Sequence, residues 1–544
     1  MVFSGYKSYL LRLNKLFSTP LAPWQLTVAC AFILTVFYNK PAMSSVTSLD
    51  STGLFFAILF MLFLINLFIC QLFSVRYLQK IWLVFLIAIG AVGQYFMLQY
   101  GVVLDKTMLV NVIETDVREA TGLLNVGMIK YFLLYLIFPM IIIVFLKIKP
   151  LSFKLFLKGY VVTLAGSLVM LSLLLFSQYQ SYAGVFREHR YLKHQALPLS
   201  VISATTSIMH TESADSEPFQ VYATDAKLIQ SSSVKPKLVI MVLGETVRAD
   251  HLGINGYSRN TTPKLSSRDL INFGAVEACG TTTAVSVPCL FSYLQRSEFD
   301  DNKAKNSDNL LDVLQRAGIK VIWRDNNSGC KGMCNRVEQD PLFAENSDFS
   351  CKAGECPDIA MLHALPQTIT THSTPQQNVL VVLHQLGNHG PEYYKRSLPE
   401  QKVFMPECQT NLLGECEQEH IINAYDNAIV ATDSLLDDTI EMLMDLNEQY
   451  DTALLYLSDH GESLGENGVY LHGLPYWMAP EAQTRVPMLL WLSDGFKQRA
   501  EFDVGCLSRS EHVSHDNIFA SMLSLFSVQT EAKQAPLDLI GLCS

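Results

Sequence analysis

Two carboxylates and one imidazole of this chain stand just beyond buried apolar stretches, where they could bind a metal ion. Asp459 comes two residues after the stretch 452–457 and is followed by His460, and Glu245 comes two residues after the stretch 238–243. Both stretches predict buried strands, and in open α/β sheets ligands collect beyond the carboxyl ends of the strands. An Asp-His pair alone is more typical of a surface, but the second strand end favours a metal site. This donor set suits Zn²⁺ or Mn²⁺ better than Ca²⁺.

The loop 279–289 offers a nucleophile, because its sequence CGTTTAVSVPC contains Thr281, Thr282 and Thr283 in a row. The flanking cysteines could close the loop, and the apolar residues after the threonines predict a helix whose N-terminal N–H groups favour phosphate. A threonine hydroxyl is a poor nucleophile unless a base or a metal ion activates it. A run of threonines is also typical of a strand or a helix N-cap, and spacing alone does not choose among the three.

Further polar clusters follow other apolar stretches in the same way. They are the segments 323–331 (WRDNNSGCK) and 384–391 (HQLGNHGP) and the pair His472-Gly473. Each cluster alone is more typical of a structural role, but their repetition at strand ends predicts one shared pocket.

Strand and helix patterns alternate from residue 237 onward. Apolar strands are predicted at 238–243, 320–323, 378–383, 452–457 and 488–492, and apolar residues at helical spacing predict a long helix over 421–446. Such alternation predicts an α/β domain with a mainly parallel sheet covered by helices.

The first third of the chain contains five long apolar stretches, at 21–38, 54–73, 81–98, 131–146 and 160–176. Each has roughly the 17–25 residues that a helix needs to cross the hydrocarbon core of a membrane. Five such stretches, almost without charges, predict an α-helical membrane domain with five transmembrane helices rather than buried helices of a soluble protein.

The charges indicate how these spans are oriented. Residues 1–190 carry 15 Lys and Arg against 6 Asp and Glu, whereas the net charge of the whole chain is −11, so residues 191–544 carry −20. Basic residues gather before the first span, between the second and third, and between the fourth and fifth: Lys7, Arg12, Lys15, Arg76, Lys80, Lys147, Lys149, Lys154 and Lys158. The positive-inside rule places these segments in the cytoplasm, so five spans deliver the rest of the chain to the opposite side. The first span lacks an A-x-A-like cleavage site and is expected to remain as an anchor. The outer domain, at −20, would repel nucleic acid.

The cysteines agree with an exported domain. Ten of the twelve lie within 279–543, and eight of them form close pairs, which is typical of disulfides. The pairs are Cys279/Cys289, Cys330/Cys334, Cys351/Cys356 and Cys408/Cys416, and the remaining Cys506 and Cys543 could pair with each other. A zinc–thiolate site built from the closest pairs is the alternative. We therefore expect the outer domain in a bacterial periplasm.

These patterns divide the chain into a transmembrane domain over 1–180, a polar bridging segment over 181–236 and a periplasmic catalytic domain over 237–544. Between the third and fourth spans, apolar residues at helical spacing predict a periplasmic surface helix near 105–126. A plain connecting loop is the alternative for that segment.

Five motifs then indicate a family. They are GET at 244–246, CGT-x-TA-x-SVPC at 279–289, DNNSGCKG at 325–332, NHGP at 388–391 and SDHGESLGENG-x-YLHG at 458–473. With these motifs, and with its five spans and bridge, the full chain closely resembles the lipid A phosphoethanolamine transferases, which include the mobile colistin-resistance enzymes. This family belongs to the alkaline phosphatase and sulfatase superfamily, so the resemblance implies an alkaline-phosphatase-like periplasmic domain.

The resemblance also assigns roles to residues. It implies that Thr283 is the nucleophile and that one zinc ion is bound tightly by Glu245, Thr283, Asp459 and His460. The residues implied to hold the phosphoethanolamine group are Asn327, Lys331, His389 and His472, of which the two histidines could also contact a second zinc ion. Asn111 and Glu119 of the surface helix are implied to face the donor lipid. This chain has Thr282 where the family usually has alanine, which adds a hydroxyl beside the nucleophile.

The implied activity is that of a monomeric inner-membrane enzyme that moves phosphoethanolamine from phosphatidylethanolamine to a phosphate group of lipid A. A phosphoethanolamine-threonine intermediate would form, diacylglycerol would leave, and the modified lipid A would bind polymyxins less well. The alternative acceptors are a lipopolysaccharide core sugar and a periplasmic glucan. A sulfatase would need a C/S-x-P-x-R motif, which 279–289 lacks, and a non-enzymatic membrane sensor would leave the residues at the strand ends unexplained.

Overall fold

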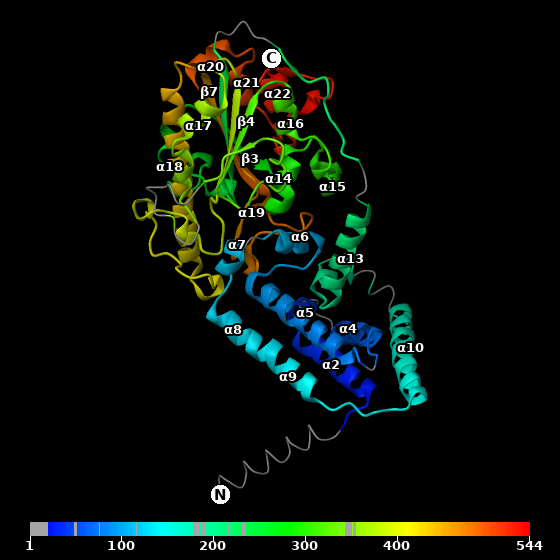
Figure 1. Cartoon of the computed structure of the whole chain (residues 1–544). Coiled ribbons are helices and arrows are strands. Elements are labelled where there is room, and N and C mark those ends of the chain that lie inside the picture. Colours follow the sequence, from blue (N-terminus) through cyan, green and yellow to red (C-terminus); the bar gives the residue numbers. More distant parts are fainter. Residues whose placement is uncertain are drawn as a thin grey trace. The chain divides into compact units, whose positions relative to one another are not determined.

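The computed structural model describes residues 20–47, 52–75, 77–115, 117–177, 182, 185–186, 189, 191–214, 218–229, 235–342, 351 and 355–544. The chain forms two compact units, which are described separately. The membrane unit contains residues up to Leu109 and Leu124–Met209, and the sheet unit contains Val110–Leu123 and His210–Ser544. Figure 1 shows both, with the membrane helices in blue and cyan.

The membrane unit consists of apolar helices. Four described helices are long and apolar enough to cross a membrane, and a fifth span results if the bent pair α2 and α3 is counted as one. The predicted membrane domain is thereby confirmed in its class. The helices are α2 (Pro23–Phe37), α3 (Lys40–Thr47), α4 (Thr52–Leu72), α5 (Gln79–Tyr100), α8 (Val126–Phe132), α9 (Phe138–Phe145) and α10 (Phe153–Ser177).

One span is continuous although a proline interrupts its hydrogen bonding. A π-helical turn, Leu133–Ile137, joins α8 to α9, so that Val126–Phe145 forms one span that contains Pro139. Pro139 has no N–H for the carbonyl of Tyr135, four residues earlier. The hydroxyl of Tyr38 donates to this carbonyl instead. In hydrocarbon an unpaired carbonyl is costly, so this bond allows the proline inside a membrane helix.

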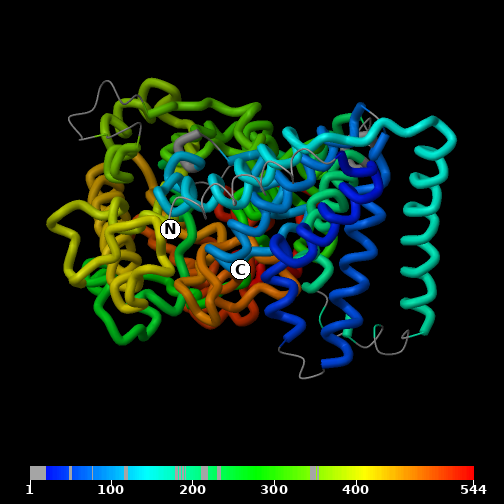
Figure 2. Tube along the Cα trace, turned by 90° about the horizontal axis from the view of Figure 1, so that it is seen from below, coloured from blue at the N-terminus to red at the C-terminus, as the bar shows by residue number. Residues whose placement is uncertain are grey.

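Within the membrane unit, α4 packs against both α2 and α10, and α5 packs against α9. Figure 2 shows the blue helices of this group together with α10, which is drawn in teal. Of the basic residues used for the topology, Lys7, Arg12, Lys15 and Arg76 lie outside the described residues. The bridging segment contains α12 (Leu192–Gln195) and α13 (Leu199–Ala214), and parts of it also lie outside the described residues.

The segment predicted as one surface helix forms two short helices, α6 (Lys106–Glu114) and α7 (Val117–Gly122). The hydroxyl of Thr115 binds the carbonyl oxygen of Asn111 just where α6 ends, a local bond that competes with helix continuation. Residues 110–123 belong to the sheet unit: the carboxylate of Glu114 lies 2.9 Å from the Lys305 ammonium.

The sheet unit is built on seven strands in the order β3-β10-β7-β2-β6-β4-β5. The neighbours β7, β2, β6, β4 and β5 are parallel, and β10 is antiparallel to both β7 and β3. The sheet is therefore mainly parallel, as predicted. The strand bounds are β2 (Lys237–Gly244), β3 (Leu270–Glu277), β4 (Lys320–Asp325), β5 (Glu338–Gln339), β6 (Val379–His384), β7 (Asp451–Ser458) and β10 (Arg485–Leu492).

Helices cover both faces of this sheet (Figure 1). One face packs against α14 (Thr283–Phe291), α16 (Leu310–Arg316) and α22 (Ile518–Leu525). The other packs against α17 (Leu365–His372) and the long α18 (Gln418–Asp445). Because both faces are covered, the central strands are apolar along their whole length; in β2 every residue after Lys237 is buried.

All five predicted strands and the long predicted helix are confirmed, whereas β3 and β5 were not predicted. β3 has the sequence LINFGAVE and is only partly buried, so it lacks a clear apolar pattern. Its Gly274 adopts a φ of 70°, at the point where the register between β3 and β10 shifts. β5 has only two residues, too few for any periodicity.

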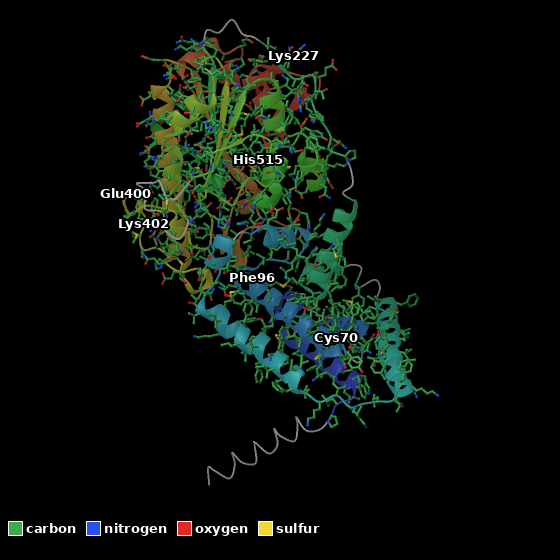
Figure 3. The ribbon with its side chains drawn as sticks, viewed as in Figure 1. Cys70, Phe96, Lys227, Glu400, Lys402 and His515 are labelled. Atoms are coloured by element: carbon green, nitrogen blue, oxygen red, sulfur yellow. A yellow bond between two sulfur atoms is a disulfide. The ribbon has the colours of Figure 1, made fainter. Side chains whose placement is uncertain are left out.

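Five disulfides join the cysteine pairs expected from the sequence: Cys279–Cys289, Cys330–Cys334, Cys351–Cys356, Cys408–Cys416 and Cys506–Cys543. The free cysteines among the described residues are Cys30 and Cys70, both buried in the membrane unit; Figure 3 labels Cys70. Four of the disulfides close short loops and therefore restrict those loops more than they stabilise the whole unit.

The Cys506–Cys543 disulfide should contribute most to the stability of the sheet unit. In the chain-entropy model, a loop of this length stabilises by about 4 kcal/mol, against about 2 kcal/mol for the loop closed by Cys330–Cys334. We expect Cys506→Ser/Cys543→Ser to become protease-sensitive at markedly lower urea than Cys330→Ser/Cys334→Ser, in full-length protein held in detergent. Equal sensitivity of the two double variants would contradict this ranking.

Candidate active site

The pairing of β2 with β7 places two carboxylates side by side. The strands are parallel and in register up to Gly244, which lies opposite Ser458. The next residues, Glu245 and Asp459, therefore leave the sheet at the same edge, and His460 follows. Gly461 is required there, because a Cβ atom at this position would lie 2.1 Å from the carbonyl oxygen of Ala482.

These three side chains form a buried cluster. Nε2 of His460 lies 3.4 Å from Oε1 of Glu245 and 3.4 Å from Oδ2 of Asp459. Both of these oxygens are buried without a hydrogen-bond donor among the described residues. One ligand atom from each of the three residues lies within 4.8 Å of the others. Two unpaired carboxylate oxygens facing one imidazole nitrogen fit a divalent cation such as zinc, which favours oxygen and nitrogen donors.

The electrostatics of the cluster also favour a cation. Burial and the neighbouring Asp459 raise the pKa of Glu245. Burial raises the pKa of Asp459 to about 6 and lowers the pKa of His460 to about 4. The charged forms of all three groups are therefore costly in this buried place, and a metal ion would offset the repulsion between the two carboxylates.

A backbone contact sets the tautomer of His460. Its Nδ1 lies 3.0 Å from the carbonyl oxygen of Gly461, which can only accept, so the proton belongs on Nδ1. The lone pair of Nε2 is then directed toward the carboxylates. A hydrogen bond of this kind is the usual way in which a protein orients a metal-binding histidine.

Thr283 is the threonine that reaches this cluster. Its Oγ1 donates to Oε2 of Glu245 at 3.1 Å and lies 3.4 Å from Nε2 of His460. Thr281 donates instead to the carbonyl of Leu474 at 2.7 Å, and the hydroxyl of Thr282 is buried without a hydrogen-bond partner among the described residues. Of the three threonines that spacing left open, Thr283 is thus the one that contacts the cluster.

Thr283 is also the first residue of α14, so the N–H groups of the first helical turn favour negative charge beside it. Several contacts hold this helix start. The hydroxyl of Ser286 donates to the carbonyl of Asp459, and the N–H of Cys279 donates to Nδ1 of His515 at 3.1 Å. Burial lowers the pKa of His515 to about 3, which keeps the ring neutral and able to accept this bond.

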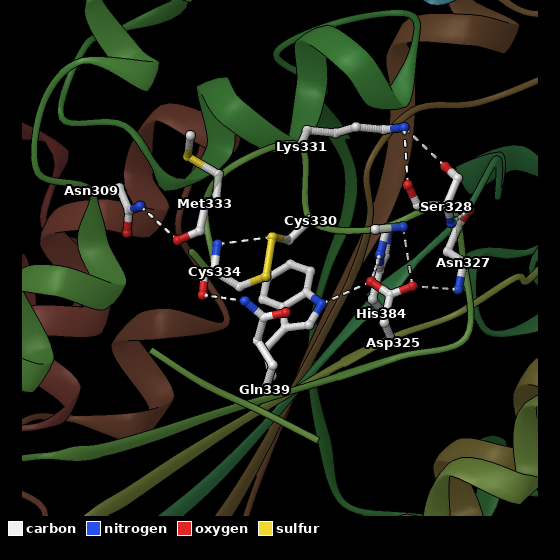
Figure 4. The surroundings of a disulfide bond; sticks show 12 residues. Asn309, Asp325, Asn327, Ser328, Cys330, Lys331, Met333, Cys334, Gln339 and His384 are labelled. Carbon is white, nitrogen blue, oxygen red and sulfur yellow. Dashed lines mark hydrogen bonds and ion pairs between the residues drawn. A yellow bond between two sulfur atoms is a disulfide. The ribbon is translucent and has the colours of Figure 1, made fainter. Parts of the chain in front are cut away.

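Asn327 positions the Glu245 carboxylate. Its amide nitrogen donates to Oε2 of Glu245 and to the carbonyl of Gln385, both at 2.7 Å. Asp325, at the end of β4, accepts from the N–H of Asn327 at 2.8 Å and contacts His384 at 3.0 Å (Figure 4). Burial opposes ionisation of Asp325, but His384 and these hydrogen bonds hold its pKa at about 2. Its charge therefore persists and fixes the turn.

Lys331 lies on the same loop, next to the Cys330–Cys334 disulfide (Figure 4). It has a φ of 51°, in the left-handed region that costs free energy for any residue but glycine. Its ammonium lies 3.0 Å from the hydroxyl of Ser328. The short disulfide loop and this bond offset the backbone strain and direct the ammonium toward the Asn327 side of the loop.

His472 and His389 line the other side of the cluster. The rings of His460 and His472 are 4.3 Å apart between centroids, and those of His472 and His389 are 5.8 Å apart. Nδ1 of His472 lies 2.8 Å from Oε2 of Glu462. The other carboxylate oxygen of Glu462, Oε1, accepts a hydrogen bond from the hydroxyl of Tyr393 at 2.6 Å. His460, Glu462 and His472 form a second group that could hold a metal ion.

Sequence reasoning did not assign a role to Glu462, whose pKa burial raises to about 7. Its place in the motif SDHGESLGENG was the available signal. Tyr425 of α18 was missed as well, since nothing local marks it. Its hydroxyl donates to the carbonyl of Thr246 at 2.6 Å and accepts from the N–H of Arg248 at 2.9 Å, which clamps the turn after Glu245.

The two predicted lipid-facing residues stand apart from this cluster. Asn111 is in α6 and is partly buried, and Glu119 belongs to α7, but its side chain lies outside the described part of the structure. No described contact joins Asn111 to Thr283.

Comparison with known proteins shows the family to which this chain belongs. A family model described as Sulfatase matches residues 237–528, and one described as Phosphoethanolamine transferase EptA/EptB matches residues 62–213. The chain is 36% identical over 545 residues to Phosphoethanolamine transferase EptA of Escherichia coli strain K12, which covers 98% of each chain. It belongs to the phosphoethanolamine transferase family. The resemblance inferred from the motifs is thereby confirmed.

Other members of the family agree. Phosphatidylethanolamine transferase Mcr-1 of Escherichia coli is 36% identical over 529 residues, covering 94% of this chain and 96% of its own. The solved structure of the integral membrane protein lipooligosaccharide phosphoethanolamine transferase A from Neisseria meningitidis superposes with a TM-score of 0.93 at 30% identity, covering 96% of this chain and 99% of that one. This transferase is accordingly an inner-membrane enzyme with a periplasmic domain of the alkaline phosphatase and sulfatase superfamily.

Metal removal should destabilise the transferase because it leaves buried carboxylates without a counter-charge. We expect a chelator to lower the thermal unfolding temperature of the wild type and zinc to restore it. Asp459→Asn should abolish the zinc response, yet the chelated variant should be more stable than the chelated wild type by roughly 1–3 kcal/mol, because a buried unpaired charge is gone.

Thr282→Ala is the matched control for this measurement. It changes a side chain beside Thr283 whose hydroxyl has no hydrogen-bond partner among the described residues, so its zinc response should equal that of the wild type. A chelated Asp459→Asn protein less stable than the chelated wild type would contradict the role of Asp459 as an unpaired buried charge.

Proposed function

We propose that this transferase moves phosphoethanolamine from phosphatidylethanolamine to a phosphate group of lipid A, with Thr283 as the covalent nucleophile. The observation that carries the proposal is the Thr283 hydroxyl, which lies 3.1 Å from Glu245 and 3.4 Å from His460 at the first residue of a helix. A nucleophile in contact with a basic group is the arrangement that covalent catalysis requires.

Glu245, Thr283, Asp459 and His460 would hold one zinc ion, and His389 and His472 could contact a second. When bound, zinc supplies Lewis-acid stabilisation and lowers the pKa of the hydroxyl that it contacts. This chain contributes the positions: Asn327 holds the Glu245 carboxylate, and the Gly461 carbonyl holds the His460 ring.

In the first step the Thr283 oxygen attacks the phosphorus of phosphatidylethanolamine. The bond from threonine oxygen to phosphorus forms, the bond to the diacylglycerol oxygen breaks, and Glu245 takes the hydroxyl proton from the atom with which it already shares a hydrogen bond. The diacylglycerol oxygen takes a proton from water and leaves as the alcohol, Glu245 returns the threonine proton to water, and phosphoethanolamine-threonine remains. Lys331 would offset charge on the phosphoryl oxygens.

In the second step a phosphate oxygen of the acceptor attacks the same phosphorus, and the threonine oxygen leaves and regains a proton. The new group carries an ammonium that masks negative charge on lipid A, so cationic polymyxins would bind the membrane less. Other acceptors use the same chemistry. A relative that is 26% identical over 467 residues is the Kdo(2)-lipid A phosphoethanolamine 7''-transferase of Salmonella typhimurium, whose name indicates a different acceptor position.

The nucleophile is tested by allowing the wild-type protein to react with phosphatidylethanolamine and then examining the protein. Intact-protein mass spectrometry should detect a phosphoethanolamine adduct, and peptide mapping should place it on Thr283. Thr283→Ala should lose transfer by several orders of magnitude, and in the presence of a chelator its unfolding temperature should equal that of the chelated wild type, because the change removes the bond-forming atom but little packing. Thr282→Ala should keep most activity. An adduct on Thr281 or Thr282 would refute the assignment.

The acceptor is tested by mass spectrometry of lipid A from cells that express the chain. We expect lipid A heavier by one phosphoethanolamine group, absent with Thr283→Ala, together with higher survival in polymyxin. Phosphoethanolamine found only on core sugars or on periplasmic glucans, with lipid A unmodified, would refute the lipid A assignment and leave the nucleophile intact.

The contribution of Asn111 and Glu119 can be tested in the same system. If they bind the donor lipid, Asn111→Ala and Glu119→Ala should raise KM for phosphatidylethanolamine and leave zinc content unchanged. Since residues 110–123 pack within the sheet unit, the loss should appear even with a soluble acceptor analogue. Unchanged kinetics in both variants would contradict the role.

A further inference from the structure

A small pocket lies beside the catalytic cluster, within the sheet unit. Its wall includes Asn327 and His389, the charged side chains of Glu355, Glu392 and Arg396, and the backbone of Gly122. Asn327 also donates to Oε2 of Glu245, the oxygen that accepts from Thr283. Asn327 therefore both lines the pocket and contacts the carboxylate to which the Thr283 hydroxyl donates.

The pocket contains two carboxylates, and one oxygen of Glu355 has capacity left to bind. Oε2 of Glu355 pairs with Arg396 at 2.9 Å, and among the described residues no donor reaches its Oε1. Glu392 pairs with Lys395 at 2.5 Å and accepts from the hydroxyl of Tyr394 at 3.2 Å. The side chains of Glu355 and Glu392 are only 29% and 16% exposed, so water screens their charges less than on an open surface.

We infer that Glu355 binds the ammonium group of the ethanolamine arm and so selects the transferred headgroup, with Glu392 adding negative charge to the wall of the same pocket. This inference rests on the proposed function. In an in-line displacement the threonine oxygen and the diacylglycerol oxygen lie on opposite sides of phosphorus. The ethanolamine arm, which stays bonded to phosphorus, then extends away from the line between these two oxygens. Its ammonium group needs negative charge beside the cluster, and this pocket provides it.

Other occupants fit the pocket less well. An acyl chain would find Leu386 and Pro391 as its apolar side chains, among three charged ones. Glu462, the other carboxylate near the cluster, is a poorer ammonium ligand because both of its oxygens are occupied, by Tyr393 and His472. The free Oε1 of Glu355 distinguishes it from Glu462.

The wall at Gly122 favours a lipid headgroup as the source of the ammonium. The carbonyl of Gly122 accepts from the amide of Asn411 at 2.7 Å, which attaches this segment to the loop closed by Cys408–Cys416. In the sequence, Gly122 precedes by four residues the helix that begins at Val126 and forms the next span. A side-chain carboxylate is near here too: a Cβ atom on Gly122 would lie 3.6 Å from Oε2 of Glu392.

The test compares two donors that differ by the ammonium. Full-length protein in mixed micelles is given acyl-labelled phosphatidylethanolamine or phosphatidylethanol, which has an ethyl headgroup, and release of labelled diacylglycerol is measured. We expect Glu355→Gln to lower kcat/KM for phosphatidylethanolamine by about tenfold, the usual size of one charge-assisted contact, and to leave phosphatidylethanol within about twofold. Glu392→Gln should act in the same direction with a smaller loss.

A second measurement does not depend on turnover of phosphatidylethanol, which could be slow. Free phosphoethanolamine and ethyl phosphate compete with labelled phosphatidylethanolamine, and the ratio of their inhibition constants reports the ammonium contact alone. The wild type should prefer phosphoethanolamine by about tenfold, and Glu355→Gln should show nearly equal constants. Glu400→Gln is the matched control, because Glu400 is an exposed carboxylate farther along the same segment (Figure 3) and should change neither assay.

The outcomes separate the inference from the proposed function. Equal losses on both lipids would show that Glu355 acts through Arg396, which also binds the carbonyl of His389, and would overturn the inference. An unchanged inhibitor ratio in Glu355→Gln would overturn it as well. If the wild type releases no diacylglycerol from phosphatidylethanolamine, the proposed function fails and the inference fails with it.

Discussion

The parallel, in-register pairing of β2 with β7 is the constraint on which the rest of this transferase depends. It brings Glu245 and Asp459 to one edge of the sheet within a buried cluster, where neither charge is stable alone. Because β6 pairs with β2 and β4 pairs with β6 in the same direction, the loops after these strands arrive at that edge too. They carry Asn327 and His389, and the site is the common end of four strands.

The surroundings of the cluster compensate for the cost of these buried carboxylates. Asn327 satisfies one oxygen of Glu245, while Tyr425 clamps the turn that follows it. Gly387 lies against the same turn with a φ of 50°, and a Cβ atom there would be 2.8 Å from the Glu245 carbonyl oxygen. Among the described residues, Oε1 of Glu245 and Oδ2 of Asp459 remain without hydrogen-bond donors. Because both oxygens face Nε2 of His460, the arrangement fits a divalent cation.

The division of the chain also bears on how lipid reaches the site. Residues 110–123 lie between two membrane spans in the sequence, yet they pack with the sheet unit through Glu114 and Gly122. The segment that follows one span in the sequence also lines the pocket next to Asn327, through Gly122. This continuity of the chain suits a substrate that has an acyl part and a charged headgroup. The disulfides at 279–289, 330–334 and 408–416 hold the three loops involved, so the site is organised before substrate arrives.

Much of this protein follows from local sequence alone. Apolar runs of sufficient length predict membrane spans whatever their neighbours. Four closely spaced cysteine pairs, and a fifth pair made of the two remaining cysteines, predict disulfides. Glu245, Asp459 and His460 stand out because they follow buried strands. What sequence could not decide depends on contacts between distant segments. That Thr283 contacts Glu245, while Thr281 and Thr282 do not, depends on the position of α14, because Glu245 lies 38 residues away in the sequence. Tyr425, Glu355 and the docking of residues 110–123 needed the packed unit, because side chains far apart in the sequence meet only after the sheet and helices have assembled.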